Sequence, residues 1–296
     1  MASGETTTTI LSDSLDDIRH SARTVREDRG GVMVGLVDKQ SLPTGTGLSW
    51  KELRYEQLTA QSVSETTIMD NPQSYSDSVI TGTPTLIGIM TKITDRVAAR
   101  INPKGFAELG KGPMRAINRK KNGDGLAMLD GFTGFSQPGA GSTLASGHVA
   151  AAVANIQGNS TEEGPDPIAT VLHGYQLKDL YDEFVSPVGT YDISNGESLN
   201  VYKNGFTGKM INGSRVFMDN EITIDSSNDA KGGAFSSGAG GAIILVQGRQ
   251  PRVVMLRDEK YGGGASEVII YDEFVYLERR DVWGAELYSD ATAPTS

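Results

Sequence analysis

The sequence contains no cysteine, only three histidines, few aromatic residues and no long hydrophobic run. The absence of cysteine excludes disulfide bonds, thiolate zinc sites and cysteine nucleophiles. No apolar stretch approaches the roughly 18 residues of a membrane-spanning helix, and the chain does not open on a basic segment followed by an apolar one. We therefore expect a soluble protein without a membrane segment, made in the cytoplasm.

The three histidines, His20, His148 and His173, lie in unrelated segments, and none belongs to an HExxH motif or another metal-ligand spacing. The sequence also lacks a phosphate-binding Walker motif and a serine nucleophile motif. We expect no catalytic residue, no cofactor and no metal site. One remote alternative stays open, an α/β enzyme that uses His173 and nearby acids, because His173 ends a predicted strand just before a predicted helix.

Three adjacent acid pairs, Asp182-Glu183, Asp258-Glu259 and Asp272-Glu273, are the other candidates for chemistry. Consecutive side chains of a strand point to opposite faces, so Asp272 and Glu273 do not converge on one substrate. A solvent-exposed helix face explains the first pair. The acid pairs therefore do not predict a catalytic dyad.

The chain carries 27 basic and 37 acidic residues, for a formal net charge of -10. Tight nucleic-acid binders neutralise phosphates with excess positive charge, so this balance argues against that class. Positive charge still concentrates at Arg115, Arg119, Lys120 and Lys121 on a predicted helix. These four residues form either a solvated face or a contact with an enclosed polyanion.

The 36 glycines and 11 prolines predict many turns and extended connections. From residue 32 to about residue 95 the chain looks extended, and few positions in the middle of this stretch resemble a core. We interpret the stretch as a long β excursion that leaves the body and returns. An isolated two-stranded ribbon is barely stable in water, so the excursion needs a partner surface.

The N-terminal segment has an amphipathic helix pattern, because Leu11, Leu15, Ile18 and Val25 recur at helical spacing. This helix packs either on its own domain or on a neighbouring molecule.

A helix is predicted within 104–129, divided or kinked at Gly110 to Pro113. The helix SGHVAAAVANIQGN, the strand PIATVLH and the helix GYQLKDLYDEFV follow and indicate an α/β layer. Strands come next, with hairpin turns at Asn204-Gly205 and Asn212-Gly213 and a turn at Gly248 to Pro251. The last long strand contains EVIIYDEFVYLERR.

Six segments in their order resemble major capsid proteins of tailed bacteriophages, over about residues 85–292. They are ITDRVAARI, DGLAMLDGFTGF, SGHVAAAVANIQGN, IATVLHGYQLKDLYDEFV, NGFTGKMINGSRVFMDNEITID and VVMLRDEKYGGGASEVIIYDEFVYLERRDVWGAELYSDAT.

The resemblance implies an α+β protein with the tailed-phage major capsid fold. The parts of that fold correspond to an N-terminal arm at 1–31, an extended β loop at 32–92, a peripheral domain with a spine helix at 93–139, an axial domain at 140–262, and a returning peripheral-domain strand with the C-terminal tail at 263–296. The carboxylate-rich last strand is then expected to present its charged side chains to solvent or to neighbouring subunits.

The function implied is that of a structural subunit of the icosahedral head of a tailed double-stranded DNA phage. Its implied partners are many copies of itself in hexamers and pentamers, a separate scaffolding protein, a portal, a decoration or cement protein and enclosed double-stranded DNA. The expected location is the virion, after synthesis in the cytoplasm of a host bacterium. An encapsulin-like shell around cargo enzymes is the alternative. Interface candidates are Leu11, Leu15, Ile18, Val25, Leu42, Pro43 and Trp50, and DNA-facing candidates are Arg115, Arg119, Lys120 and Lys121.

Overall fold

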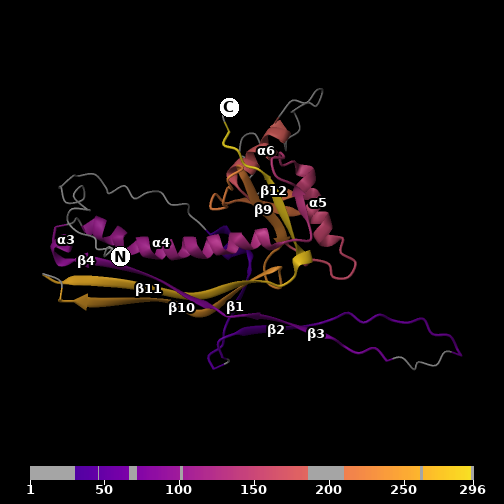
Figure 1. Cartoon of the computed structure of the whole chain (residues 1–296), viewed down its shortest axis with the longest axis horizontal. Helices are drawn as coiled ribbons and strands as arrows, with labels where there is room; N and C mark the ends of the chain where they lie inside the picture. The colour runs from indigo at the N-terminus through magenta and orange to yellow at the C-terminus, as the bar shows by residue number, and fades with distance from the viewer. Residues whose placement is uncertain are drawn as a thin grey trace.

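The computed structural model describes the backbone of residues 31–45, 47–66, 72–100, 103–185, 210–260 and 263–294, with the side chains of all of these except 103–110 and 184–185. The molecule is elongated, and helices cover parts of two separate sheets (Figure 1). The N-terminal interface candidates Leu11, Leu15, Ile18 and Val25 lie outside the described residues, as does the predicted turn at Asn204-Gly205.

A four-stranded sheet with the strand order β1-β10-β11-β4 forms the elongated part of the body (Figure 1). Strands β10 and β11 pair antiparallel along almost their whole length, and β4 pairs antiparallel with β11. The short β1 pairs parallel with the first part of β10 only. The bounds are β1 Asp38–Ser41, β4 Thr85–Thr94, β10 Ile243–Asp258 and β11 Ala265–Glu278.

A six-stranded sheet with the order β5-β12-β9-β6-β8-β7 forms the second part of the body. Its central strand β6 is buried at every residue, which fits its unbroken apolar sequence IATVL. Asn212 and Gly213 both have positive φ angles and join β7 to β8, so the predicted hairpin turn is confirmed. The bounds are β5 Ser136–Pro138, β6 Ile168–Leu172, β7 Met210–Ile211, β8 Ser214–Met218, β9 Asp229–Ser236 and β12 Gly284–Asp290.

Two hydrophobic clusters lie on the two faces of the six-stranded sheet. Helices α5 and α6 cover one face through Val149, Ile156 and Leu180. On the other face, Val171 and Phe235 pack in a cluster shared with α2, α4 and the first part of β10. This second cluster joins the two sheets into one core. The helices are α2 Val32–Leu36, α3 Asp95–Ala98, α4 Pro103–Ala127, α5 Ser146–Gln157 and α6 Gly174–Val185, with 3-10 turns η1 Met128–Gly131 and η2 Asp281–Trp283.

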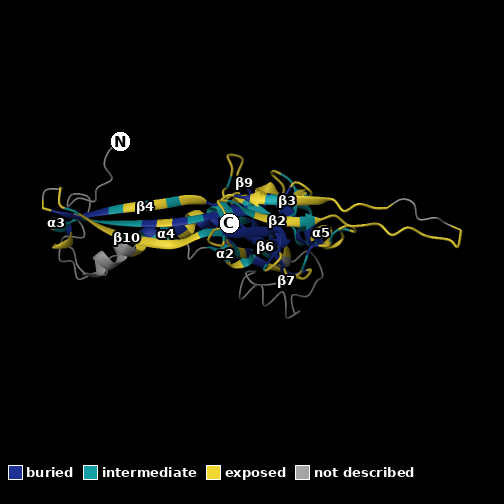
Figure 2. Cartoon of the chain, turned by 90° about the horizontal axis from the view of Figure 1, so that it is seen from below, coloured by how far each residue is buried: buried dark blue, intermediate teal, exposed yellow. Residues whose placement is uncertain are grey.

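Strands β2 (Trp50–Tyr55) and β3 (Asp77–Gly82) form a separate two-stranded sheet, here called the ribbon together with the connection 56–76. The ribbon projects away from the body, on the side opposite to the turn between β10 and β11 (Figures 1 and 2). Every described residue from Tyr55 to Val79 is exposed. The described residues from Tyr55 to Val79 thus have no core of their own, whereas α2, β1 and β4, at the two ends of the predicted β excursion, pack with the body.

Helix α4 is continuous across Gly110 to Pro113, so the predicted division into two pieces is wrong. A proline inside a helix removes one hydrogen bond and costs about 3 kcal/mol. Helix α4 nevertheless continues through Pro113, and it contacts β4, β11 and α2. Packing against these elements outweighs the local cost of the proline.

Two other local predictions are also wrong. Residues Val32–Leu36 form the short helix α2 rather than an extended segment, because Met33 is completely buried and its N–H donates to Asn122 Oδ1 on α4 at 3.2 Å. Gly248 to Pro251 is not a turn but a pair of bulges inside the single strand β10. A bulge tolerates Pro251, which has no N–H to donate to the strand ladder.

The grouping of strands into the two sheets does not follow the boundaries of the predicted domain segments. Strand β4, mostly within the expected β loop at 32–92, belongs to the four-stranded sheet, and so does β10 from the expected axial domain at 140–262. Strand β12, from the last expected segment at 263–296, belongs to the six-stranded sheet. The two sheets therefore exchange strands across the expected boundaries, and the domain scheme itself stays a prediction.

Candidate assembly surface

The two faces of the ribbon differ in chemistry. The strand period of two places Trp50, Glu52 and Arg54 on one face, where they are half-buried, and Lys51, Leu53 and Tyr55 on the other, where they are exposed. The first face is turned toward the body, because Glu52 and Arg54 form ion pairs with residues of the body. The second face points to solvent.

Four apolar residues follow one another on this outer face and are here called the ribbon stripe. Leu53 lies opposite Val79 in the strand register, and the ring of Tyr55 meets that of Tyr75 edge to face at 6.4 Å. The exposed fractions are 58% for Leu53, 66% for Tyr55, 69% for Tyr75 and 50% for Val79. The described residues toward the free end of the ribbon are exposed (Figure 2). Contiguous apolar residues of this kind mark a surface that binds another molecule.

Charged side chains at the base of the ribbon form a network, here called the ribbon latch. The Arg279 guanidinium donates to both carboxylate oxygens of Glu52, at 2.7 and 2.9 Å, and to Asp38 Oδ2 at 2.8 Å. Beside it, Glu162 Oε2 accepts from Arg54 at 2.8 Å and also from Arg280. The ribbon latch comprises Asp38, Glu52, Arg54, Glu162, Arg279 and Arg280.

The surroundings of the ribbon latch keep its central pair charged. Burial by itself raises the pKa of Asp38, but the hydrogen bond and charge of Arg279 and the Gly240 N–H together hold this pKa below its ordinary value. Burial lowers the pKa of Arg279, and the bonds to Glu52 and Asp38 outweigh this effect and raise it. Both side chains are therefore ionised at neutral pH.

The outer part of β10, Arg249–Asp258, is a strand edge and is here called the β10 edge. Strand β1 pairs only with residues 244–247 of β10, so on the side away from β11 the β10 edge has no strand beside it among the described residues. Val253, Met255 and Leu256 are exposed there, Met255 at 77%. Unpaired N–H and C=O groups beside apolar side chains form a surface to which another chain can bind.

The four basic candidates on α4 do not lie together. Arg115 is half-buried, while Arg119 and Lys120 are exposed, and Lys120 pairs with Asp124 one turn away at 2.5 Å. Lys121 is buried, with its ammonium 2.6 Å from Asp272 Oδ2 on β11 and 3.1 Å from Gln247 Oε1. The structure therefore removes Lys121 from the predicted DNA-facing group.

The buried Lys121–Asp272 pair also corrects the interpretation of the last long strand. Asp272 is only 2% exposed and faces α4, so it does not present its charge to solvent or to a neighbouring subunit. Glu273 points to the opposite face and lies 4.0 Å from Arg249. The argument that these two carboxylates cannot form one dyad is consistent with this geometry.

The remaining interface candidates lie at the base of the ribbon. Leu42 and Trp50 are half-buried and Pro43 is exposed, while the neighbouring Leu48 is exposed at 81%. Leu48 thus adds an exposed apolar side chain at the base of the ribbon. Other exposed apolar residues lie on the ribbon stripe, on the β10 edge and on β4, where Leu86 and Met90 are each 57% exposed.

The histidines with described coordinates have local structural roles. His148 Nδ1 accepts from the Ala145 N–H at 3.1 Å at the start of α5. His173 Nδ1 accepts from the Tyr175 N–H at 3.2 Å, and burial lowers the pKa of His173. Within the described residues, no group of three or more His, Cys, Asp or Glu side chains is arranged to hold a metal ion.

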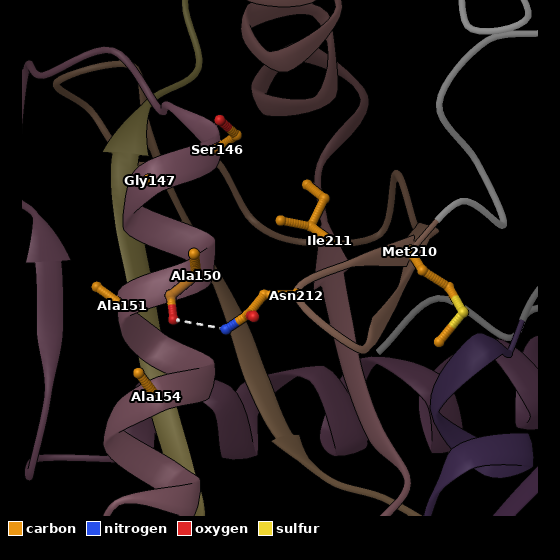
Figure 3. Close-up of a pocket in the computed structure, with 8 residues that line it drawn as sticks. All are labelled: Ser146, Gly147, Ala150, Ala151, Ala154, Met210, Ile211 and Asn212. Atoms are coloured by element: carbon orange, nitrogen blue, oxygen red, sulfur yellow. Dashed lines mark hydrogen bonds between the residues drawn. The ribbon is translucent and has the colours of Figure 1, made fainter. Parts of the chain in front are cut away.

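A shallow groove lies between α5 and the β7–β8 hairpin (Figure 3). The lining from α5 consists of small residues, among them Ala150 and Ala154, and Asn212 Nδ2 donates to the Ala150 carbonyl at 3.4 Å. No acidic, basic or histidine side chain lines the groove. Ser146 supplies a hydroxyl to the lining, and this Oγ donates to Glu183 Oε1 at 3.0 Å. Separately, no described helix is long and apolar enough to cross a membrane.

Comparison with known proteins identifies the fold. No protein-family model and no curated protein matches the sequence. Solved structures do match along nearly the whole chain. The capsid protein of cyanophage Pam1 is similar at a TM-score of 0.68 and 11% identity, over 99% of this chain and 100% of that chain. The capsid of cyanophage P-SCSP1u matches with a TM-score of 0.68 and 10% identity over 92% of both chains.

This is the tailed-phage capsid fold. The SrpI encapsulin of Synechococcus elongatus shares it, with a TM-score of 0.61 and 10% identity over 98% of both chains. The α+β class and the capsid resemblance expected from the sequence are thus confirmed at the level of the fold.

Sequence reasoning missed the ribbon latch and the β10 edge. Arg279 and Arg280 stand beside each other in the sequence, but the position of their partners Glu52 and Glu162 depends on how distant segments meet. The β10 edge was hidden because Gly248 to Pro251 looked like a turn that would end the strand.

Proposed function

We propose that this chain is the structural subunit of an icosahedral shell, the head of a tailed double-stranded DNA phage. The observation that carries the proposal is the ribbon, in which every described residue from Tyr55 to Val79 is exposed although several are apolar. A two-stranded ribbon without a core is marginal in water. Packing against another copy supplies the missing contacts.

Charge and shape favour the β10 edge of the next copy as the surface that the ribbon covers. The segment from Glu56 to Asp77 contains acidic residues and no lysine or arginine. The β10 edge carries Arg249 and Arg252 beside its exposed apolar residues. A ribbon that binds a different patch on the next copy makes a head-to-tail contact, and such contacts close into rings. Hexamers and pentamers are rings of this kind.

The proposed partners follow from such a shell. They are many copies of this chain, a separate scaffolding protein, a portal and a decoration or cement protein. The proposed location is the virion, after synthesis in the cytoplasm of a host bacterium. In the predicted domain scheme, 93–139 and 263–296 supply the peripheral domain and 140–262 the axial domain, with the strand exchanges described above. The chain has no enzymatic role in this proposal, and turnover by the dispersed subunit that is lost in a His173→Ala variant would contradict it.

Enclosed DNA is proposed to touch α4 through non-specific contacts of Arg115, Arg119 and Lys120. The formal charge of -10 disfavours strong adhesion of DNA to the rest of the wall. Replacing the three residues with glutamine is expected to weaken DNA retention at raised salt, measured by nuclease sensitivity of filled particles. Lys178→Gln on α6 is the matched surface control for this experiment. Equal DNA retention by the triple variant and the wild type contradicts the contact.

An encapsulin-like compartment is the second candidate, because the SrpI encapsulin matches over 98% of both chains. The two candidates differ in what the shell encloses. A portal and a large terminase encoded beside this chain support the phage head. A neighbouring gene for a cargo enzyme such as a peroxidase or a ferritin-like protein supports the compartment.

Electron microscopy of the purified chain tests the proposal directly. We expect shells, tubes or rings of capsomers, with a sedimentation coefficient that depends on protein concentration. A monodisperse monomer at high concentration, with the ribbon folded against its own body, rules the proposal out. Nucleic-acid and protein staining of particles isolated from cells then separates the phage head from the encapsulin-like compartment.

A further inference from the structure

The ribbon latch joins four segments of the chain. Asp38 comes from β1, Glu52 and Arg54 from β2, and Glu162 from the connection between α5 and β6. Arg279 and Arg280 follow directly after β11 and contact the other three segments. Two of its ion pairs, Arg279–Glu52 and Arg54–Glu162, connect the body with the ribbon. The other two, Arg279–Asp38 and Arg280–Glu162, lie within the body and hold the side chains that bind the ribbon.

We propose that the ribbon latch fixes the angle at which the ribbon leaves the body, and thereby the curvature of the shell. The inference rests on the proposed function, since an angle of this kind matters only if the ribbon reaches a neighbouring copy. Arg279, Arg280 and Glu162 are positioning residues in this mechanism. None of them is required to touch the neighbouring copy.

The hydrogen bonds of Arg279 are directional and so constrain rotation. A guanidinium is a flat, rigid fork, and two parallel bonds to Glu52 fix the plane of β2 relative to it. Arg279 is fixed in turn by Asp38 Oδ2 and by the Gly241 carbonyl, which accepts at 2.7 Å. Only 11% of the Arg279 side chain is exposed, so solvent screens these charges weakly.

Glu162 supplies a second attachment at a different point of the same face. Its carboxylate receives Arg54 from the ribbon and Arg280 from the body, and its backbone carbonyl accepts from Trp283 Nε1 at 3.2 Å. Two attachments, at Glu52 and at Arg54, prevent rotation about either one. A single attachment would leave the ribbon free to pivot.

The backbone at the base of the ribbon does not fix the angle by itself. The described residues of 42–49, which lead into β2, form no helix or strand, and Thr83 and Pro84 separate β3 from β4. Ser49 and Thr83 share one exposed hydrogen bond of 2.8 Å across this base. One backbone feature adds to the latch, because Gly82 lies so close to Leu277 that an added Cβ would be 2.4 Å from it.

The experiment measures the ribbon angle in the dispersed subunit and the geometry of the shell separately. Because the chain has no cysteine, Ser62→Cys on the ribbon and Asn155→Cys on α5 can be spin-labelled without a background. Double electron–electron resonance then gives the distribution of distances between the two spin labels. The latch variants are Glu52→Gln, which keeps the bond from Arg279 to Asp38, and Arg279→Gln combined with Glu162→Gln. Lys178→Gln is the matched surface control.

We expect a narrow distribution in the wild type and in Lys178→Gln, and a distribution about twofold wider in the latch variants, because an element held by few contacts samples more orientations. Unlabelled latch variants are expected to form particles of mixed diameter or open sheets. Circular dichroism and thermal unfolding verify that the body stays folded, and Glu52→Gln is used if the double variant does not fold.

A narrow distribution in every latch variant overturns the proposal, and so do wide distributions combined with shells of wild-type diameter. If the wild type forms no assembly at all, the proposed shell function fails, while the distance measurements still show whether the latch fixes the ribbon. The two failures are therefore distinguishable.

Discussion

At the scale of single residues, Lys121 and Asp272 were both expected on the surface, but they are buried and paired with each other. Lys121 on α4 and Asp272 on β11 form an ion pair of 2.6 Å, with the Phe274 ring 4.9 Å from the ammonium and Gln247 bonded to both groups. A buried pair of this kind contributes little net stability but makes the loss of one partner costly. It also fixes how α4 lies on β11.

Removing one partner of this pair therefore destabilises the subunit strongly. Lys121→Met is expected to lower the free energy of unfolding by about 3–5 kcal/mol, because Asp272 stays buried without its cation. The double variant Lys121→Met with Asp272→Leu is expected to recover most of the loss. Urea unfolding of the dispersed subunit measures both. Equal stability of the single and the double variant contradicts the prediction.

A matched control is Lys178→Met, which removes an exposed ion pair with Asp182 on α6. Exposed pairs of this spacing contribute roughly 0.3–0.5 kcal/mol, so this variant is expected to unfold almost as the wild type does.

Asp38 makes the stability that the ribbon latch contributes depend on pH. Its pKa lies below the ordinary value of 3.8, so the stability it contributes is complete above that pH and disappears as the pH falls through the lower folded pKa. The difference in unfolding free energy between the wild type and Asp38→Asn is expected to be constant near neutral pH and to shrink below pH 3.8. Urea unfolding at a series of pH values measures this difference. A difference that grows toward acid pH reverses the sign and excludes the assignment.

At the scale of elements, α4 shows packing prevailing over local sequence. Pro113 is buried inside a helix that continues through it for 25 residues in total. The propensity cost of proline is local, whereas α4 also gains the contacts that it makes with β4, β11 and α2.

Pro113→Ala is expected to stabilise the subunit. Restoring helix propensity gains about 3 kcal/mol, and losing two buried methylenes costs about 1.6 kcal/mol, which leaves a gain on the order of 1 kcal/mol. Thermal unfolding of the dispersed subunit measures the change. Pro43→Ala, in an exposed connection, is the control and is expected to lose up to about 1 kcal/mol through the unfolded chain. A lower melting temperature for Pro113→Ala means that the proline ring contributes more to packing than its helix cost.

At the scale of the whole molecule, the ribbon and the body have separate roles. The body has two hydrophobic clusters that join both sheets, whereas the connection 56–76 contributes no buried residue among those described. Folding of the subunit therefore depends on the body, and assembly in the proposed shell depends on the ribbon.

Replacing residues 56–76 with an Asn-Gly turn between β2 and β3 tests this separation. The shortened subunit is expected to keep its melting temperature within a few degrees, since every replaced residue that the structure describes is exposed. It is expected to lose shell formation, measured by electron microscopy and sedimentation. Normal shells from the shortened chain contradict the role of the ribbon in assembly. An unfolded subunit contradicts the claim that the body folds without the ribbon.

The sequence by itself determined the class of elements and the excursion without a core. The segment PIATVLH predicted a strand, Asn212-Gly213 predicted a hairpin turn, and the stretch around 56–76, with few core-like positions, predicted an excursion without a core. Each of these predictions depends on neighbouring residues only. The order of the segments also indicated the fold, which the solved capsid structures confirm.

Only the tertiary structure decided which distant charges meet. Lys121 with Asp272, and Arg279 with Glu52, are separated by more than a hundred residues in the chain, and no local pattern brings them together. The continuity of α4 and of β10 was likewise decided by packing, since helix and strand propensities at Pro113 and Pro251 favour an interruption. Local sequence sets propensities of a few kcal/mol at most, and contacts between distant segments outweigh them wherever enough surface is buried.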